Sequence, residues 1–297
     1  MNRRHALAAI AAALAAPAVA RAATRLKVAT SFTVLADMAR NVAGDLADIE
    51  SITKPGGEIH GYEPTPRDLV RAQGAGLVLY NGLNLERWFA QFLRNLSDVA
   101  AAVVSTGIDP IAVAAGADAQ AKPNPHGWMA LDSALIYTRN IAEALAGADP
   151  ANAEAYRANA RAYADRITAT IAPLRDALRA LPADRRWLAT SEGAFSYLAR
   201  DAHLRELYLW TINADAQGTP QQVRHVVDVM RAEKVPAIFS ESTVSDRPAR
   251  RIAAETGARY GGTLYVDSLS AADGPVPSYL DLLRVTHSTI LKGLSDG

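Results

Sequence analysis

Short apolar runs alternate with amphipathic stretches along most of the chain, starting at Leu26. The apolar runs are short enough to be buried strands, and in the stretches between them apolar residues recur at spacings of three and four. This alternation is typical of a parallel sheet with helices on both faces. In the first half, we expect strands over 26–32, 47–53, 76–81 and 102–106 and helices over 34–44, 65–75 and 86–98.

The second half repeats the scheme. Its expected strands cover 186–191, 204–210, 235–241 and 259–267, and its expected helices cover 194–202, 219–234, 247–257 and 278–294. Two similar halves in 297 residues predict two α/β lobes, because a chain of this length usually exceeds one core.

Residues 151–181 separate the two halves and carry one apolar stripe. The stripe comprises Tyr156, Ala160, Tyr163, Ile167, Ile171, Leu174, Leu178 and Leu181. We expect a single long helix that links an N-terminal lobe (23–150) to a C-terminal lobe (182–297) and fixes their separation. The alternative is an ordinary helix inside one domain.

The first 22 residues read as an export signal that is removed from the mature protein. A basic start, an alanine-rich apolar stretch and small residues at the end have the composition of such a segment, which is too short to span a membrane. Residues 18–20 and residues 20–22 both fit the small-x-small pattern of a cleavage site. The pair Arg3-Arg4 is compatible with export by the twin-arginine route as well as by the general route. The alternative is an amphipathic first helix.

The composition of the chain argues against some kinds of binding partner and some kinds of metal site. Apolar residues make up 49% of the chain and charged residues 21%, which is typical of a globular protein. A formal charge of zero gives no sign of a nucleic-acid partner. The chain has no cysteine, which excludes disulfides, thiolate metal sites and a lipid-modified N-terminal cysteine.

Four metal-capable side chains lie at or beyond the ends of expected strands, two in each half. His60 lies between a glycine pair and a Pro-containing run in GGEIHGYEPTPRDL, ahead of a helix that Thr65, Pro66 and Asp68 should cap. The others are His126 in NPHGWM, Glu192 in TSEGAF and Asp267 in LYVDSLS.

Ligands of open α/β sheets collect at the carboxyl ends of strands, so two facing lobes would gather these four residues around one divalent cation. Each also has a simpler reading: a surface histidine, a carboxylate near a helix N-terminus, or a strand-end acid. We expect Glu241 to support a metal ligand or fix a neighbouring loop, with direct binding of the metal as the alternative. We expect His203, His225 and His287 to lie on helix or strand surfaces.

Several motifs in order resemble the metal-specific solute-binding proteins of manganese, iron and zinc ABC importers. They are GGEIHGYEPTPRDL, LVLYNGLNLERW, NPHGWMALDSALIYTRNI, TSEGAFSYLA, FSESTVSDRPAR and LYVDSLSAADGPVPSYLDLLR. The resemblance implies two Rossmann-like lobes joined by a rigid backbone helix. It also implies a periplasmic receptor that holds one metal ion between the lobes and delivers it to a membrane permease.

Carried over position by position, the resemblance places the ligands at His60, His126, Glu192 and Asp267. Zinc receptors usually have a histidine where this chain has Glu192, and a His- and acid-rich loop where residues 110–125 read PIAVAAGADAQAKPNP. These departures favour Mn²⁺ or Fe²⁺ as cargo, with a zinc receptor as the alternative. We expect a monomeric receptor without a lipid anchor.

A metal-dependent hydrolase is an alternative of a different class. A catalytic metal needs an open position for water or substrate, whereas four protein ligands fill much of the shell. The chain contains no nucleophile elbow, P-loop or dinucleotide fingerprint, so we expect no enzyme activity. An adhesin or structural role would leave the four candidate ligands unexplained.

Overall fold

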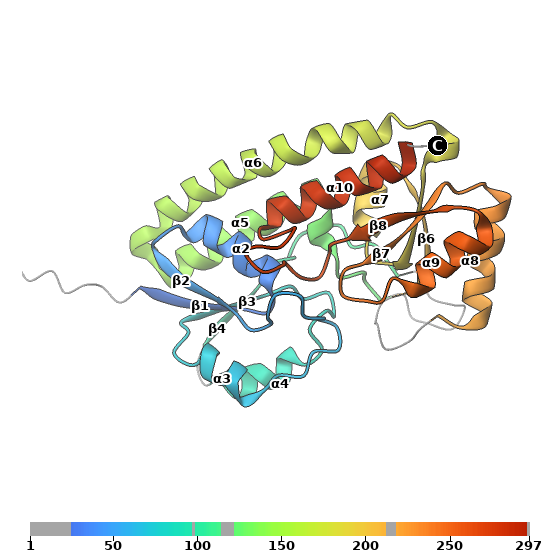
Figure 1. The fold of residues 1–297 in the computed structure, drawn as a ribbon. Coiled ribbons are helices and arrows are strands. Elements are labelled where there is room, and N and C mark those ends of the chain that lie inside the picture. Colours follow the sequence, from blue (N-terminus) through green and yellow to red (C-terminus); the bar gives the residue numbers. More distant parts are fainter. Residues whose placement is uncertain (1–24, 97–98, 114–121, 212–217, 296–297) are drawn as a thin grey trace, which may run out of the picture.

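Two parallel four-stranded sheets form the framework of the protein (Figure 1). The structure, a computed structural model, describes residues 25–96, 99–113, 122–211 and 218–295. The first sheet has the order β2-β1-β3-β4 and the second the order β6-β5-β7-β8, so the two halves share one topology. The predicted fold class is confirmed.

All eight predicted strands are present, with small shifts of their ends. The first sheet contains β1 (Leu26–Thr30), β2 (Ala47–Ser51), β3 (Leu77–Tyr80) and β4 (Ala100–Val103). The second contains β5 (Trp187–Glu192), β6 (Arg205–Trp210), β7 (Ala237–Glu241) and β8 (Arg259–Leu264). β4 begins two residues before its predicted start, because three alanines pair with β3 although alanine has a low strand propensity.

The helices pack on both faces of each sheet. In the first half they are α2 (Thr33–Ala43), α3 (Pro66–Ala72), α4 (Phe89–Arg94) and α5 (Leu131–Ala148). In the second half they are α7 (Ser196–Ala202), α8 (Pro220–Ala232), α9 (Arg247–Thr256) and α10 (Tyr279–Ser295). Helix α5 was not predicted, and α4 is shorter than predicted. Short 3₁₀ turns cover Gly127–Met129, Pro150–Asn152 and Ala183–Arg185.

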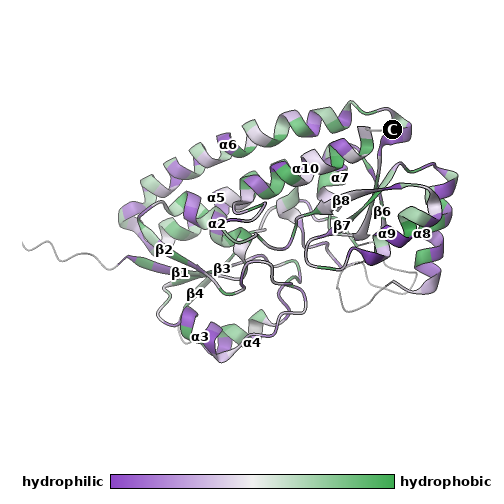
Figure 2. Cartoon of the chain, viewed as in Figure 1, coloured by the Kyte–Doolittle hydropathy of each residue, from purple (hydrophilic) through white to green (hydrophobic). Residues whose placement is uncertain are grey.

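The long helix α6 (Ala153–Arg179) lies along one side of the molecule (Figure 1). Its 27 residues give a length of roughly 40 Å at about 1.5 Å per residue, and it continues through Pro173. Most of the predicted stripe is buried, and apolar and polar bands alternate along the helix (Figure 2). Near one end Asn159 donates to the Val42 carbonyl, and at the other end Arg179 donates to the Asp201 carbonyl.

One apolar core continues through both halves. Its largest cluster contains Val28 and Phe32 of the first half, Tyr163 and Ile167 of α6, and Phe239 of the second half. A smaller cluster lies between the second sheet and helices α8 and α9, on the sheet face away from α7 and α10. The shared core and α6 therefore fix how the two sheets sit against each other.

Within the described ranges, no helix combines the length and the apolar character needed to cross a lipid bilayer. The predicted export signal and residues 114–121 of the 110–125 segment lie outside the described residues. The predicted lobe boundaries remain a prediction.

Candidate metal centre

The structure brings the four predicted ligands to the place where the carboxyl ends of the two sheets face each other. His60 lies in the loop after β2, His126 directly precedes the turn Gly127–Met129, Glu192 ends β5, and Asp267 follows β8 by three residues. All four are buried, with exposed fractions between 0% and 6%. Residues far apart in the chain thus share one closed site.

The distances define a compact set of nitrogen and oxygen atoms. The Nε2 atoms of His60 and His126 are 3.1 Å apart. Asp267 Oδ1 lies 3.3 Å from His126 Nε2 and 3.8 Å from His60 Nε2, and Glu192 Oε1 lies 3.5 Å from His60 Nε2. One ligand atom each from His60, His126 and Asp267 falls within 4.8 Å of the other two. Glu192 borders this group on the His60 side.

The His60 loop is held by its own glutamate and by the second half. Glu58 accepts hydrogen bonds from the backbone N–H groups of His60 and Gly61. Gly56, at a φ of 77°, donates its N–H to the Leu269 carbonyl at 3.0 Å. The predicted capping box of Thr65 and Asp68 is confirmed. The loop is therefore fixed in place, as its glycines and prolines predicted.

Burial lowers the pKa of His60 to about 4. The cause is that a charged imidazolium loses its hydration in this interior, and the neighbouring His126 and Arg87 add to the effect against the opposing charge of Asp267. At neutral pH, His60 is a neutral imidazole, which is the form that binds a metal ion.

Asn124 orients His126, a role that the sequence analysis did not assign. Its Oδ1 lies 2.8 Å from His126 Nδ1 and accepts from the His126 backbone N–H. Because an amide oxygen only accepts, Nδ1 carries the proton and Nε2 offers its lone pair to the site. Asn124 Nδ2 donates across the lobes, at 2.7 Å, to the Gly193 carbonyl next to Glu192. In the sequence, the motif NPHGWM, which begins with Asn124, was the signal that could have indicated this role.

The acidic side of the site is built by β5, β7 and the segment after β8. Glu241 accepts from the Ser191 N–H at 3.2 Å and so contacts the end of strand β5 rather than a loop. Burial raises the pKa of Glu241 to about 8. Thr243 Oγ1 donates to Asp267 Oδ2 at 3.4 Å, and Ser268 Oγ lies 3.3 Å from Thr33 Oγ1 of the first half.

Asp267 Oδ1 is a buried oxygen without a hydrogen-bond partner among the described residues. It faces Nε2 of His126, whose proton is on the opposite ring nitrogen. Two lone-pair atoms at 3.3 Å repel each other unless a cation or a proton lies between them. This arrangement fits a metal ion bound by imidazole nitrogen and carboxylate oxygen.

The remaining histidines differ in their surroundings. His203 ends α7 and His225 lies on α8, both exposed as predicted. The prediction for His287 was wrong: it is buried in α10, where its Nδ1 donates to the Leu283 carbonyl, and burial lowers its pKa to about 4. The Leu283 carbonyl satisfies Nδ1 and the side chain is buried, so His287 is a core residue.

Comparison with known proteins places this geometry in a family. A family model described as "Zinc-uptake complex component A periplasmic" matches residues 28–293. The chain belongs to this family. Proteins similar to this chain include the iron-binding protein YfeA of Yersinia pestis, which is 57% identical over 271 residues. The aligned residues cover 91% of this chain and 87% of YfeA. The manganese ABC transporter substrate-binding lipoprotein PsaA of Streptococcus pneumoniae serotype 4 is 33% identical over 278 residues, 91% and 90% of the two chains.

Solved structures agree with the fold. The Mn-bound periplasmic metal binding protein of Candidatus Liberibacter asiaticus is 43% identical and has a TM-score of 0.86, with 91% of this chain and all of that chain covered. Its Cd-bound form is 42% identical with a TM-score of 0.85 and the same coverage. The names in this family include iron, manganese and zinc, so membership alone does not select the metal.

Proposed function

We propose that this protein captures one divalent transition metal ion, Mn²⁺ or Fe²⁺, between its two lobes and delivers it to the permease of an ABC importer. His60 and His126 supply nitrogen ligands from the first lobe, and Glu192 and Asp267 supply oxygen ligands from the second. The observation that carries the proposal is the orphaned Asp267 Oδ1 facing the unprotonated Nε2 of His126.

The ligand set supports the choice of metal. Two carboxylates balance the charge of a divalent cation, and each can bind through two oxygens, which raises the coordination number above the four of structural zinc. Relatives whose names specify iron or manganese point the same way. Zinc binds such ligands tightly as well, so equilibrium affinity alone does not select the transported metal. The ease with which each metal is released to the permease matters as much.

The same arrangement favours transport over catalysis. The candidate ligands have exposed fractions of at most 6%, which leaves little access for a substrate, and protein ligands occupy much of the metal shell. The receptor acts outside the cytoplasm as a monomer without a nucleic-acid partner, after a leader covering 1–22 has directed export by the general or the twin-arginine route and been removed.

The test is metal analysis of the protein purified from its native compartment without added metal, followed by calorimetric titration of the metal-free protein. We expect close to one equivalent of manganese or iron in the native sample and saturation at one equivalent in the titration. Binding should also raise the melting temperature, because the metal stabilises only the folded state.

Two variants make the test specific. His60→Ala should abolish stoichiometric binding, whereas His225→Ala, which removes an exposed histidine of α8, should bind like the wild type. Stoichiometric zinc without manganese or iron in the native sample would assign the protein to zinc uptake. Saturation at two or more equivalents would contradict a single site between the lobes.

A further inference from the structure

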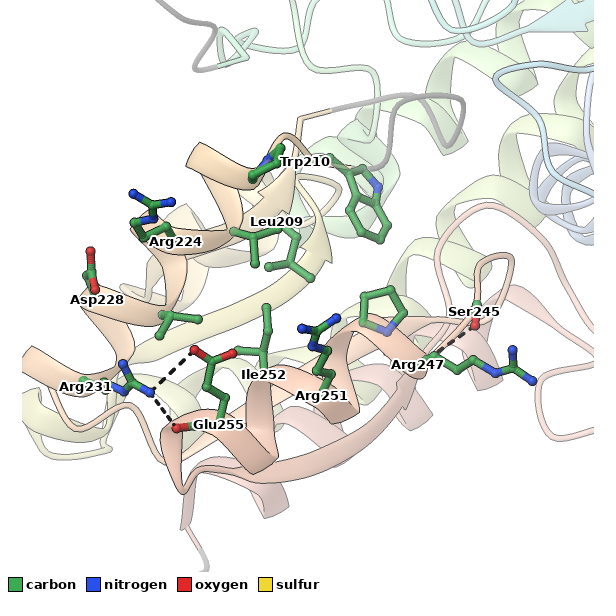
Figure 3. A pocket seen from close by; sticks show the side chains of 15 residues that line it. Leu209, Trp210, Arg224, Asp228, Arg231, Ser245, Arg247, Arg251, Ile252 and Glu255 are labelled. Atoms are coloured by element: carbon green, nitrogen blue, oxygen red, sulfur yellow. Dashed lines mark hydrogen bonds and ion pairs between the residues drawn. The ribbon is translucent and has the colours of Figure 1, made fainter.

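A groove of about 940 Å³ lies between α8 and α9, over the smaller apolar cluster of the second sheet (Figure 3). Its floor is apolar and comes from the end of β6 and from both helices. The floor residues are Leu209, Trp210, Val223, Val227 and Ile252. Figure 3 shows the two helices as opposite walls, with charged side chains along their edges.

The edges of the groove are rich in arginine. Arg224 of α8 and Arg247 and Arg251 of α9 are exposed, and they form no ion pair within the described part of the chain. Arg231 is engaged by Glu255, 3.6 Å away, and Asp228 is the other acidic residue of the lining. The groove therefore combines an apolar floor with free cationic edges, which complements an amphipathic segment whose polar side is acidic.

The groove is linked to the candidate metal centre by the sheet. Trp210, on its floor, pairs in register with Glu192, and its carbonyl accepts from the Gly193 N–H at 3.1 Å. The starts of α8 and α9 follow β6 and β7, so this end of the groove opens at the same sheet edge as the metal centre. A partner in the groove would contact the strand next to the one that carries Glu192.

We propose that this groove docks an acidic, amphipathic segment on the extracytoplasmic face of the permease, an inference that rests on the proposed delivery function. The outer loops of membrane proteins are depleted of Lys and Arg, so a basic receptor surface suits that face. The free arginines would speed the association of the receptor with the permease and orient the complex, and the apolar floor would bury the apolar side of the permease segment.

The experiment measures how metal-loaded protein stimulates ATP hydrolysis by its cognate permease complex in lipid nanodiscs. The test variant is Arg224→Glu combined with Arg251→Glu. The matched control is Arg139→Glu combined with Arg161→Glu, which reverses two exposed arginines beside a smaller groove between α5 and α6. Calorimetry with manganese and thermal melting establish that each variant is folded and loaded.

We expect the test variant to need at least tenfold more protein for half-maximal stimulation, with manganese affinity within twofold of wild type. The neutral pair Arg224→Gln with Arg251→Gln should show a smaller loss, and the control pair none. Equal stimulation by the test variant and the wild type would overturn the groove as the dock and leave the delivery function intact. A dimer that the test variant dissociates, with unchanged stimulation, would assign the groove to a second copy. No stimulation by wild-type protein would refute delivery and the dock together.

Discussion

Asn124→Ala tests whether orientation of His126 determines metal affinity. The substitution removes the acceptor for His126 Nδ1 and the donor to the Gly193 carbonyl, at 2.8 and 2.7 Å. Without that acceptor, the imidazole is free to rotate or to move its proton to Nε2, which would no longer bind a metal. Both orphaned groups are buried, so water does not replace the lost partner.

The expected magnitude follows from these two bonds. Loss of a residue that orients a metal ligand typically lowers affinity by about 10- to 100-fold, or roughly 1.4–2.8 kcal/mol. Each buried group left without a partner costs about 1–3 kcal/mol of folding stability, so the loss of these two partners should destabilise the metal-free variant by roughly 2–6 kcal/mol. The two effects are measured separately, by competition calorimetry with manganese and by urea unfolding.

Two further variants separate orientation from general destabilisation. Asn124→Asp keeps an oxygen facing His126 but places a second oxygen against the Gly193 carbonyl, so it should lose stability and retain most of its affinity. Ser196→Ala removes only the 3.0 Å contact to Asn124 Nδ2 and the bond to Glu206, and should also bind manganese like the wild type. If Asn124→Ala is destabilised but binds manganese as tightly as the wild type, the orienting role is refuted.

Three other predictions concern selectivity, protons and catalysis. Glu192→His should lower manganese affinity about tenfold, or about 1.4 kcal/mol, and change zinc affinity less, because it replaces an anionic oxygen ligand by a neutral nitrogen ligand. Equal losses of affinity for the two metals in competition calorimetry would show that Glu192 has no selectivity role. Burial lowers the pKa of His60 and His287 to about 4, whereas an unfolded histidine titrates near ~6.5. The unfolded chain therefore binds more protons in this window, so the stability of metal-free protein should be complete above pH ~6.5 and fall toward pH ~4, by up to roughly 3 kcal/mol per histidine. Urea unfolding across this range should show a shallower slope for His287→Gln, and parallel curves would exclude His287 as a cause. Metal-loaded protein should hydrolyse ester, phosphate and peptide substrates no faster than His60→Ala, and turnover that disappears in that variant would favour the hydrolase alternative.

Local sequence patterns determined much of the fold. The alternation of short apolar runs with helical spacing placed eight strands, and the stripe from Tyr156 to Leu178 placed α6. These features are readable because burial of one face imposes a period of two or of 3.6 on the residues themselves. No element was predicted over the residues of α5, which directly follow the motif that contains His126.

The candidate ligands were identified through strand ends and family motifs, but their mutual geometry needed the tertiary structure. His60 and Asp267 are separated by more than two hundred residues of chain, and their 3.8 Å approach depends on how the shared core and α6 hold the two sheets together. The same holds for the bond from Asn124 to Gly193, for the burial of His287 and for the groove between α8 and α9. A sequence specifies which side of each element is apolar, whereas the contacts between distant elements arise only when all of those sides are buried at once.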